Sequence, residues 1–289
     1  MDRIKVRGEL VTFYSSIGQR IDGIFYQNDE NSTTVIHIHG SLGNFYHNQF
    51  IRLMADKYLA RRTNLLSFNL TSHDGIGEGF RGKEFSYIGG SIVDFNTCLY
   101  DIDGAIAFSR KFSDKILLQG HSLGCDRVLH FIIKNKYDYD FILLAPCDSF
   151  QLQTNWLVSE TVGQQIERLK KEMVADKEFD WLDVREYGVR QNDEEYVIPI
   201  TRKALLSIME GPVFQLINIK NPAKFQLNQR AFIYISGKDP LQTESSDVMF
   251  NYFEQRIHSV TKYFAPNGDH DLGGCEDSVI NAILTWISR

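Results

Sequence analysis

Cysteine is scarce in this chain, and long apolar runs are absent. The four cysteines lie far apart without a C-x-x-C pair, which argues against a metal cluster, a redox motif or a small disulfide-stapled scaffold: Cys98, Cys125, Cys147 and Cys275. We expect them to be buried thiols in a reducing compartment. No stretch approaches the length of a membrane span, and residues 1–11 lack the apolar core of a signal peptide. A cytoplasmic protein with no membrane span is therefore predicted.

Positive charge is also too sparse for a nucleic-acid partner. The formal net charge is −6, and the best candidate for a basic stripe, Arg168 with Lys170 and Lys171, is flanked by Glu167 and Glu172. We expect that run to be a solvated helix face, because binding a polyanion needs a longer basic surface. The 289 residues, of which 43% are hydrophobic and 24% charged, suffice for one large globular core with or without an inserted subdomain.

Short apolar runs alternate with helical patterns along much of the chain, which is typical of strands and crossover helices in a mostly parallel sheet. Residues 4–14 and 20–26 are expected to pair as an antiparallel edge. Further strands are predicted at 34–39, 64–70, 116–119, 141–145, 231–236 and 262–265. Helices are predicted at 50–59, 94–111, 123–135, 248–257 and 278–287, and a long loop is predicted at 71–90.

The pattern changes after residue 149. Residues 151–225 show helical stretches at 158–173 and 202–209 but no convincing strand. We therefore predict an α/β core formed by residues 1–150 and 226–289, with a mainly helical cap, residues 151–225, inserted before the last two strands. Four aromatic residues of the cap either line a pocket or pack the cap onto the core: Trp156, Trp181, Tyr187 and Tyr196.

The motif G-x-S-x-G is present as Gly120-His121-Ser122-Leu123-Gly124. It follows the predicted strand 116–119 directly and opens the predicted helix 123–135, which is the context of a nucleophile elbow. Such a sharp turn keeps the serine exposed above the sheet, and side chains at either glycine would collide with the neighbouring strand and helix. Ser122 is therefore the predicted nucleophile. The alternative is a tight turn with an incidental serine.

A serine hydroxyl needs a base to take its proton, so a histidine is expected after a later strand. His270 lies in a polar loop straight after the last predicted strand and is the predicted base. Asp239 follows the preceding strand and is the predicted acid, which holds the imidazole and stabilises the imidazolium. The order serine, acid, histidine is the one that accompanies this elbow. Asp148 is the reserve acid, whereas Asp269 and Asp271 lie too close to the histidine in sequence to be preferred.

The tetrahedral intermediate also needs two backbone N–H donors, which together form an oxyanion hole. Leu123, the residue after the nucleophile, is expected to supply one. The other is expected from the loop after strand 34–39, where the N–H of Ser41 is chosen because Gly40 lets the backbone approach the substrate closely.

At these residues the chain resembles the α/β-hydrolase superfamily. The resemblance rests on His39-Gly40 after an early strand, on the elbow, on Gly237-Lys238-Asp239-Pro240 and on Gly268-Asp269-His270, and it spans nearly the whole chain except the cap. A looser likeness, to the capped esterases that include siderophore ester hydrolases, rests on Phe68-Asn69 and on Cys125-Asp126-Arg127. The resemblance implies an α/β-hydrolase fold and ester cleavage without a cofactor.

Two other patterns are not expected to bind a cofactor or a metal. Residues 77–82 fit G-x-G-x-x-G, but they neither follow a strand directly nor open an apolar helix, so a flexible loop near the rim of the site is expected. His37 and His39 lie two apart on a strand, yet no carboxylate or cysteine spacing completes a metal-ligand set.

The sequence thus predicts a serine hydrolase that cleaves a carboxylic ester of a small molecule through an acyl-enzyme intermediate. A thioesterase, an amidase or an acyltransferase would use the same residues. A non-catalytic ligand-binding protein on the same fold is a further alternative, because a fold does not fix a function. The sequence does not indicate the oligomeric state.

Overall fold

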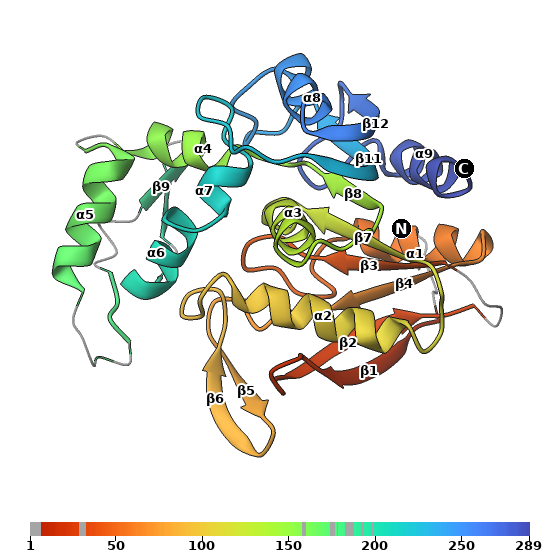
Figure 1. The fold of residues 1–289 in the computed structure, drawn as a ribbon, viewed down its shortest axis with the longest axis horizontal. Helices are drawn as coiled ribbons and strands as arrows, with labels where there is room; N and C mark the ends of the chain where they lie inside the picture. The colour runs from red at the N-terminus through yellow and green to blue at the C-terminus, as the bar shows by residue number, and fades with distance from the viewer. Residues whose placement is uncertain are drawn as a thin grey trace.

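The computed structural model describes residues 7–28, 33–157, 160–173, 177, 179–182, 188–191, 194–197 and 199–289. At its centre lies an eight-stranded sheet, mostly parallel as predicted, with an antiparallel pair at one edge (Figure 1). From that edge the strand order is β1 (Glu9–Tyr14), β2 (Arg20–Tyr26), β4 (Thr63–Phe68), β3 (Thr33–Ile38), β7 (Ile116–His121), β8 (Phe141–Leu144), β11 (Leu227–Ser236) and β12 (Ile257–Ala265). Residues 4–6 of the first predicted strand lie outside the described residues.

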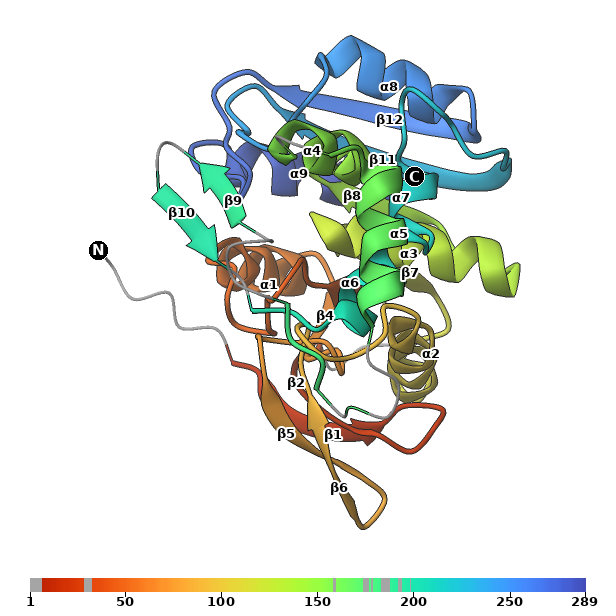
Figure 2. The same cartoon turned by 90° about the vertical axis from the view of Figure 1, so that its left-hand side faces the viewer.

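Helices cover both faces of the sheet, because the central strands carry apolar residues on both sides. On β3, for example, Val35 and Ile36 belong to two different apolar clusters, one on each face. Figures 1 and 2 show the helices in two layers, which the clusters also separate. One layer contains α1 (Phe50–Ala60) and α9 (Glu276–Ile287), and the other α2 (Thr97–Ser109), α3 (Leu123–Asn135) and α8 (Ser246–Glu254). All five predicted core helices are present.

The prediction of a long loop at residues 71–90 is wrong. Within it, β5 (Gly77–Arg81) and β6 (Glu84–Ile88) pair as an antiparallel hairpin that projects away from the main sheet (Figure 1). Gly82 has φ +60° and permits the tight turn, and the rings of Phe80 and Phe85 pack edge to face across the pair, with their centroids 6.1 Å apart. The glycines and charges of this segment disguise its strands. The G-x-G-x-x-G pattern therefore lies in a hairpin and not between a strand and a helix.

The chain between β8 and β11 forms a mainly helical insertion, as predicted. Its helices are α4 (Ser149–Trp156), α5 (Val162–Glu172), α6 (Arg202–Met209) and α7 (Val213–Leu216). The prediction that it contains no strand is wrong, because β9 (Gly188–Gln191) and β10 (Glu194–Val197) pair as a short antiparallel hairpin. These strands have four residues each and are rich in charged and amide side chains, so no apolar alternation marks them.

The insertion docks on the core through backbone and aromatic contacts. The N–H of Thr201 donates to Ser91 O (2.8 Å), and the N–H of Phe95 donates to Ser207 Oγ (2.9 Å). Phe179 stacks on Trp181 (centroids 6.0 Å apart) and packs edge-on against Tyr87 of β6 (5.3 Å). Trp181 thus contributes to packing. Tyr187 and the side chains of Trp156 and Tyr196 lie outside the described residues.

All four cysteines are free; three are buried as expected, and Cys275 is partly exposed. In the part of the chain that the structure describes, no helix combines the length and apolarity that a membrane span requires.

Candidate active site

The turn between β7 and α3 has the strained geometry of a nucleophile elbow. Ser122 adopts φ 54° and ψ −127°, a backbone conformation that is rare for a residue with a side chain. A Cβ atom at Gly120 would lie 2.3 Å from Gly124 O, and one at Gly124 would lie 2.2 Å from Ile38 O. Only glycine fits at these two positions, so the turn brings strand and helix together as closely as predicted.

Gly40 allows the loop after β3 to approach Ser122 closely. A Cβ atom at Gly40 would lie 2.9 Å from Ser122 Cβ and 3.4 Å from Ser122 Oγ. The backbone of this loop therefore passes directly beside the serine side chain. Ser41 and Leu123, the two residues predicted to supply oxyanion donors, line one cavity of about 50 Å³. Ile200 and Ile208 of the insertion line the same cavity.

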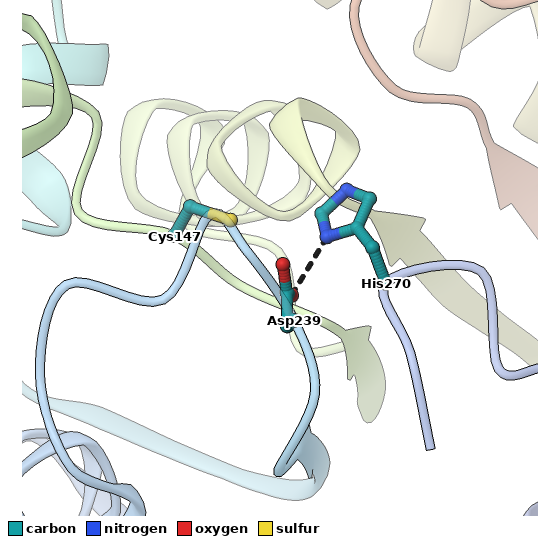
Figure 3. A group of neighbouring side chains, drawn as sticks. All are labelled: Cys147, Asp239 and His270. Atoms are coloured by element: carbon teal, nitrogen blue, oxygen red, sulfur yellow. Dashed lines mark hydrogen bonds and ion pairs between the residues drawn. The ribbon is translucent and has the colours of Figure 1, made fainter. Parts of the chain in front are cut away.

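His270 and Asp239 are hydrogen-bonded, although 31 residues separate them. Each lies just after a strand, Asp239 after β11 and His270 after β12. Because these two strands are parallel, both residues lie at the carboxyl ends of the strands. Figure 3 shows the imidazole facing the carboxylate, with Nδ1 2.7 Å from Oδ2. The Asp239 side chain is fully buried, and its Oδ1 accepts the N–H of Leu241 (2.8 Å), which fixes the carboxylate.

The other candidate acids make different bonds. Asp148 caps α4: its Oδ1 accepts the N–H of Gln151, and its Oδ2 accepts the N–H of Ile219, both at 2.8 Å. It therefore ties the two ends of the insertion together. Asp269 accepts the N–H groups of Asp271 and Gly273 within its own turn. Among the bonds of the described residues, only Asp239 pairs with the histidine ring.

His121 was not predicted to take part, although it lies inside the G-x-S-x-G motif. Its Nε2 donates to the carbonyl oxygen of His270 (2.8 Å), and the two rings lie 5.0 Å apart. Burial, and next the nearby His270, lower the pKa of His121 to about 4. The ring is therefore neutral at neutral pH and anchors the backbone of His270. His121 occupies a variable position of G-x-S-x-G, and its partner lies 149 residues further along the chain. The motif therefore gives no sequence signal for this hydrogen bond.

Cys147, Asp239 and His270 form the one group among the described residues whose ligand atoms could meet at a metal ion, all lying within 4.8 Å of one another (Figure 3). The 2.7 Å bond between Asp239 and His270 is too short to enclose an ion at bond lengths of about 2.0–2.3 Å without opening. Burial, and next the nearby Asp239, raise the pKa of the Cys147 thiol well above its usual value. A protonated thiol is a poor ligand, so the three residues fit a metal badly as they stand.

No protein-family model and no curated protein matches this sequence. Solved structures match over nearly the full length of both chains at low identity. They include DcsB, solved in complex with its substrate analogue (14% identity, 98% of each chain, TM-score 0.67), and a thermostable carboxyl esterase from Bacillus coagulans (13%, 98% of this chain and 99% of that one, TM-score 0.66). The alpha/beta hydrolase GrgF from Penicillium sp. sh18 matches equally well (13%, 98% of each chain, TM-score 0.67). Together with the sheet order and the elbow, these likenesses identify the fold of this chain as the α/β-hydrolase fold.

Proposed function

We propose that this protein is a serine hydrolase that cleaves a carboxylic ester of a small molecule through an acyl-enzyme intermediate on Ser122. One observation carries the proposal: the 2.7 Å bond between His270 and Asp239, which lie, like the serine of the strained elbow, after the carboxyl ends of parallel strands. The chemical reason is that a carboxylate on Nδ1 leaves Nε2 of the imidazole free to act as a base. Structural similarity to a protein named as a carboxyl esterase adds support.

In the first half-reaction, Ser122 Oγ attacks the ester carbonyl carbon while His270 Nε2 takes the hydroxyl proton. The buried Asp239 carboxylate stabilises the imidazolium that forms. The carbonyl oxygen becomes an oxyanion, and the N–H groups of Ser41 and Leu123 donate to it. His270 then returns the proton to the leaving alcohol as the carbon–oxygen bond breaks, which leaves the acyl group on Ser122.

In the second half-reaction, water replaces the alcohol and the roles repeat. His270 takes a proton from the water, the hydroxide attacks the acyl carbon, and the same proton returns to Ser122 Oγ as the acid departs. A thioester substrate, or transfer of the acyl group to another alcohol or amine, would follow the same steps. The insertion, residues 151–225, acts in this proposal as a cap that limits the acyl group, since Ile200 and Ile208 line the small cavity beside both oxyanion donors. The four free thiols support a reducing, cytoplasmic location.

Hydrolysis of a p-nitrophenyl ester series, combined with fluorophosphonate labelling of Ser122, tests the proposal. Ser122→Ala and His270→Ala should each lower kcat by about 10⁴-fold or more, and Asp239→Asn by about 10³–10⁴-fold. Ser122→Ala alone lacks the serine to be labelled, and His270→Ala and Asp239→Asn should be labelled more slowly than the wild type because the hydroxyl is less activated. Turnover that survives unchanged in the first two variants would refute the assigned roles.

Matched controls separate the site from general effects on folding. Ser259→Ala and His258→Ala replace an exposed serine and an exposed histidine on β12 and should leave kcat unchanged. Asp148→Asn keeps an N-cap side chain on α4 and should retain most activity, because its carboxylate binds the insertion and not the imidazole. A larger loss in Asp148→Asn than in Asp239→Asn would reverse the choice of acid. A wild-type protein that binds esters without labelling or turnover would favour a ligand-binding function.

A further inference from the structure

Arg127 holds the loop that carries one of the proposed oxyanion donors. It lies on α3, five residues after the nucleophile, and only 3% of its surface is exposed. Its Nη1 donates to the carbonyl oxygens of His39 (2.8 Å) and Gly40 (3.0 Å), and its Nη2 donates to Ser72 Oγ (3.0 Å). One buried guanidinium thus binds two consecutive carbonyls beside the serine.

An ion pair does not explain the burial of this cation. The described residues provide Arg127 with three neutral acceptors and no salt bridge. The carboxyl groups of Asp101 and Asp126 act on it only through space, and burial raises the pKa of Asp126 well above its usual value. A buried charge without a counter-ion is costly, and an apolar side chain would serve the packing of α3 better. The cation therefore indicates a role beyond packing.

His39 adds a second donor to the same carbonyl. Its Nε2 accepts the backbone N–H of Leu70 (3.1 Å), so the ring proton must lie on Nδ1, which donates to Gly40 O (2.9 Å). The ring is fully buried, and burial followed by the charge of Arg127 lowers its pKa well below the usual value. His39 is consequently neutral and fixed in one tautomer.

Both donors converge on the peptide group that joins Gly40 to Ser41. In a trans peptide the C=O and the N–H are coplanar and point in opposite directions. Fixing Gly40 O with Arg127 and His39 therefore fixes the direction of the Ser41 N–H. Donors on the oxygen also polarise the peptide, which makes its N–H a stronger donor in turn. No backbone acceptor for the Ser41 N–H is found within the described residues.

We propose that Arg127 and His39 form a clamp on the Gly40–Ser41 peptide that aims and polarises the Ser41 N–H toward the oxyanion. This inference rests on the proposed function. The two side chains are positioning residues: they touch the donor's peptide and not the substrate. Their contribution is largest where negative charge develops on the substrate oxygen, so they lower the barrier of both half-reactions without adding to the binding of the uncharged ester.

Hydrolysis of a p-nitrophenyl ester and of its thiono analogue by Arg127→Met and Arg127→Lys tests the clamp. Sulfur is a weaker hydrogen-bond acceptor than oxygen, so the thiono ester depends less on an oxyanion hole. We normalise kcat to the concentration of Ser122 that the fluorophosphonate labels. For the oxygen ester, this kcat should fall by about 10-fold to 100-fold in Arg127→Met, which is less than the fall expected when an oxyanion donor is removed outright. KM should change by no more than about twofold, and kcat for the thiono ester should fall far less. Arg127→Lys keeps the charge and one donor and should lie between.

Arg230→Met is the matched control. Arg230 is partly buried, pairs with Asp140 at 2.7 Å, and lies at the opposite end of β11 from Asp239, so neither kcat nor the ratio between the two esters should change. Equal losses on both esters in the Arg127 variants, or a rise in KM at constant kcat, would overturn the clamp. Arg127→Lys supplies the same comparison if Arg127→Met folds poorly.

The amide proton resonance of Ser41 gives a readout that does not need turnover. Loss of the charged donor on Gly40 O should move this resonance upfield in Arg127→Met and leave it in place in Arg230→Met. An unmoved Ser41 resonance overturns the clamp whether or not the protein cleaves esters. Failure of wild-type Ser122 to react with the fluorophosphonate, with the resonance shifted as expected, contradicts the proposed function alone.

Discussion

Single side chains hold together parts of the site that lie far apart in sequence. His121 is next to Ser122 and donates to the backbone of His270, while Asn48 donates to the side chain of Asp271 (2.8 Å). One neutral group therefore holds the backbone of the proposed base, and another holds the side chain of the residue that follows it. Neutral anchors suit this position, because a permanent positive charge beside His270 would disfavour the imidazolium that forms during catalysis.

Gly124 sets how closely the elbow approaches β3. A Cβ atom there would lie 2.2 Å from Ile38 O and 2.9 Å from His39 O, and both obstacles are backbone atoms that cannot rotate away. Gly124→Ala should therefore lower the free energy of unfolding by about 1–3 kcal/mol, as overpacking does elsewhere. Urea unfolding of the two proteins measures this difference.

Gly163→Ala is the control for that prediction. Gly163 lies in α5, and nothing lies within 4 Å of its added Cβ atom. Because alanine is the better helix former, this substitution should stabilise the protein by up to about 1 kcal/mol. A Gly124→Ala protein as stable as the wild type would show that β3 and α3 can move apart, and the close packing inferred at the elbow would be wrong.

At the scale of elements, the sequence predicted best where the apolar pattern is strong and the ends carry clear signals. The observed bounds of α3 and α6 are those predicted, since α3 has a regular apolar face and Thr201 caps α6 with a bond to the N–H of Ala204 (3.2 Å). The hairpins β5–β6 and β9–β10 were missed because glycine and charged residues mask their alternation. In these hairpins cross-strand contacts outweigh local propensity.

The proposed site likewise has one part that the sequence predicts and one part that it does not. Ser122, Asp239 and His270 each follow a strand of a parallel sheet, so local patterns and chain order sufficed to select them. The bonds of Arg127 to His39 and Gly40 join residues 88 and 87 apart in the sequence. No local spacing encodes such contacts. They become visible only when the sheet places β3 beside β7.

Helix α6 limits the size of the cavity beside the proposed oxyanion hole. Ile208 of this helix lines the cavity together with Leu123, so Ile208→Ala should make room for a longer acyl chain. We expect the ratio of kcat/KM for a hexanoate ester to that for an acetate ester to rise by about 10-fold or more, because each methylene group in such a pocket is worth about 1–3 kcal/mol.

The chain-length preference of purified Ile208→Ala, measured with p-nitrophenyl esters, checks this prediction. Ile219→Ala removes the same side chain from a partly buried site in the insertion that packs against the core, and it should leave the ratio unchanged. A ratio that changes equally in both variants would mean that loosening the insertion, and not the lining of this cavity, sets the acyl preference.

At the scale of the whole molecule, a chain of polar groups runs through the apolar layer beneath α1. Tyr58 Oη donates to Gln119 Oε1 (3.0 Å), and Gln119 Nε2 donates to His37 Nδ1 (2.8 Å). The chain links helix α1 to strands β7 and β3, and all three residues are buried. His37 can accept this bond only while Nδ1 is unprotonated. The charge state of one buried histidine thus contributes to the stability of the core.

Burial, and next the nearby His121, lower the pKa of His37 to about 3 in the folded protein. In the unfolded chain the pKa is about 6.5, so between these values the unfolded state binds the proton and the folded state does not. The stabilisation from neutral His37 is therefore fully present above pH 6.5 and is lost as the pH falls toward 3. The loss amounts to about 1.4 kcal/mol per pH unit for one proton.

His37→Asn removes this titration. At pH 7.5 the variant should be less stable than the wild type, but the gap should narrow by about 2 kcal/mol between pH 6.5 and pH 5, because only the wild type loses the contribution of neutral His37. Urea unfolding at several pH values measures the gap directly, and His258→Asn, at an exposed position on β12, controls for the loss of a histidine. A gap that stays constant with pH would mean that His37 titrates alike in the folded and unfolded chains, and the polar chain beneath α1 would then not be the acid-sensitive part of the core.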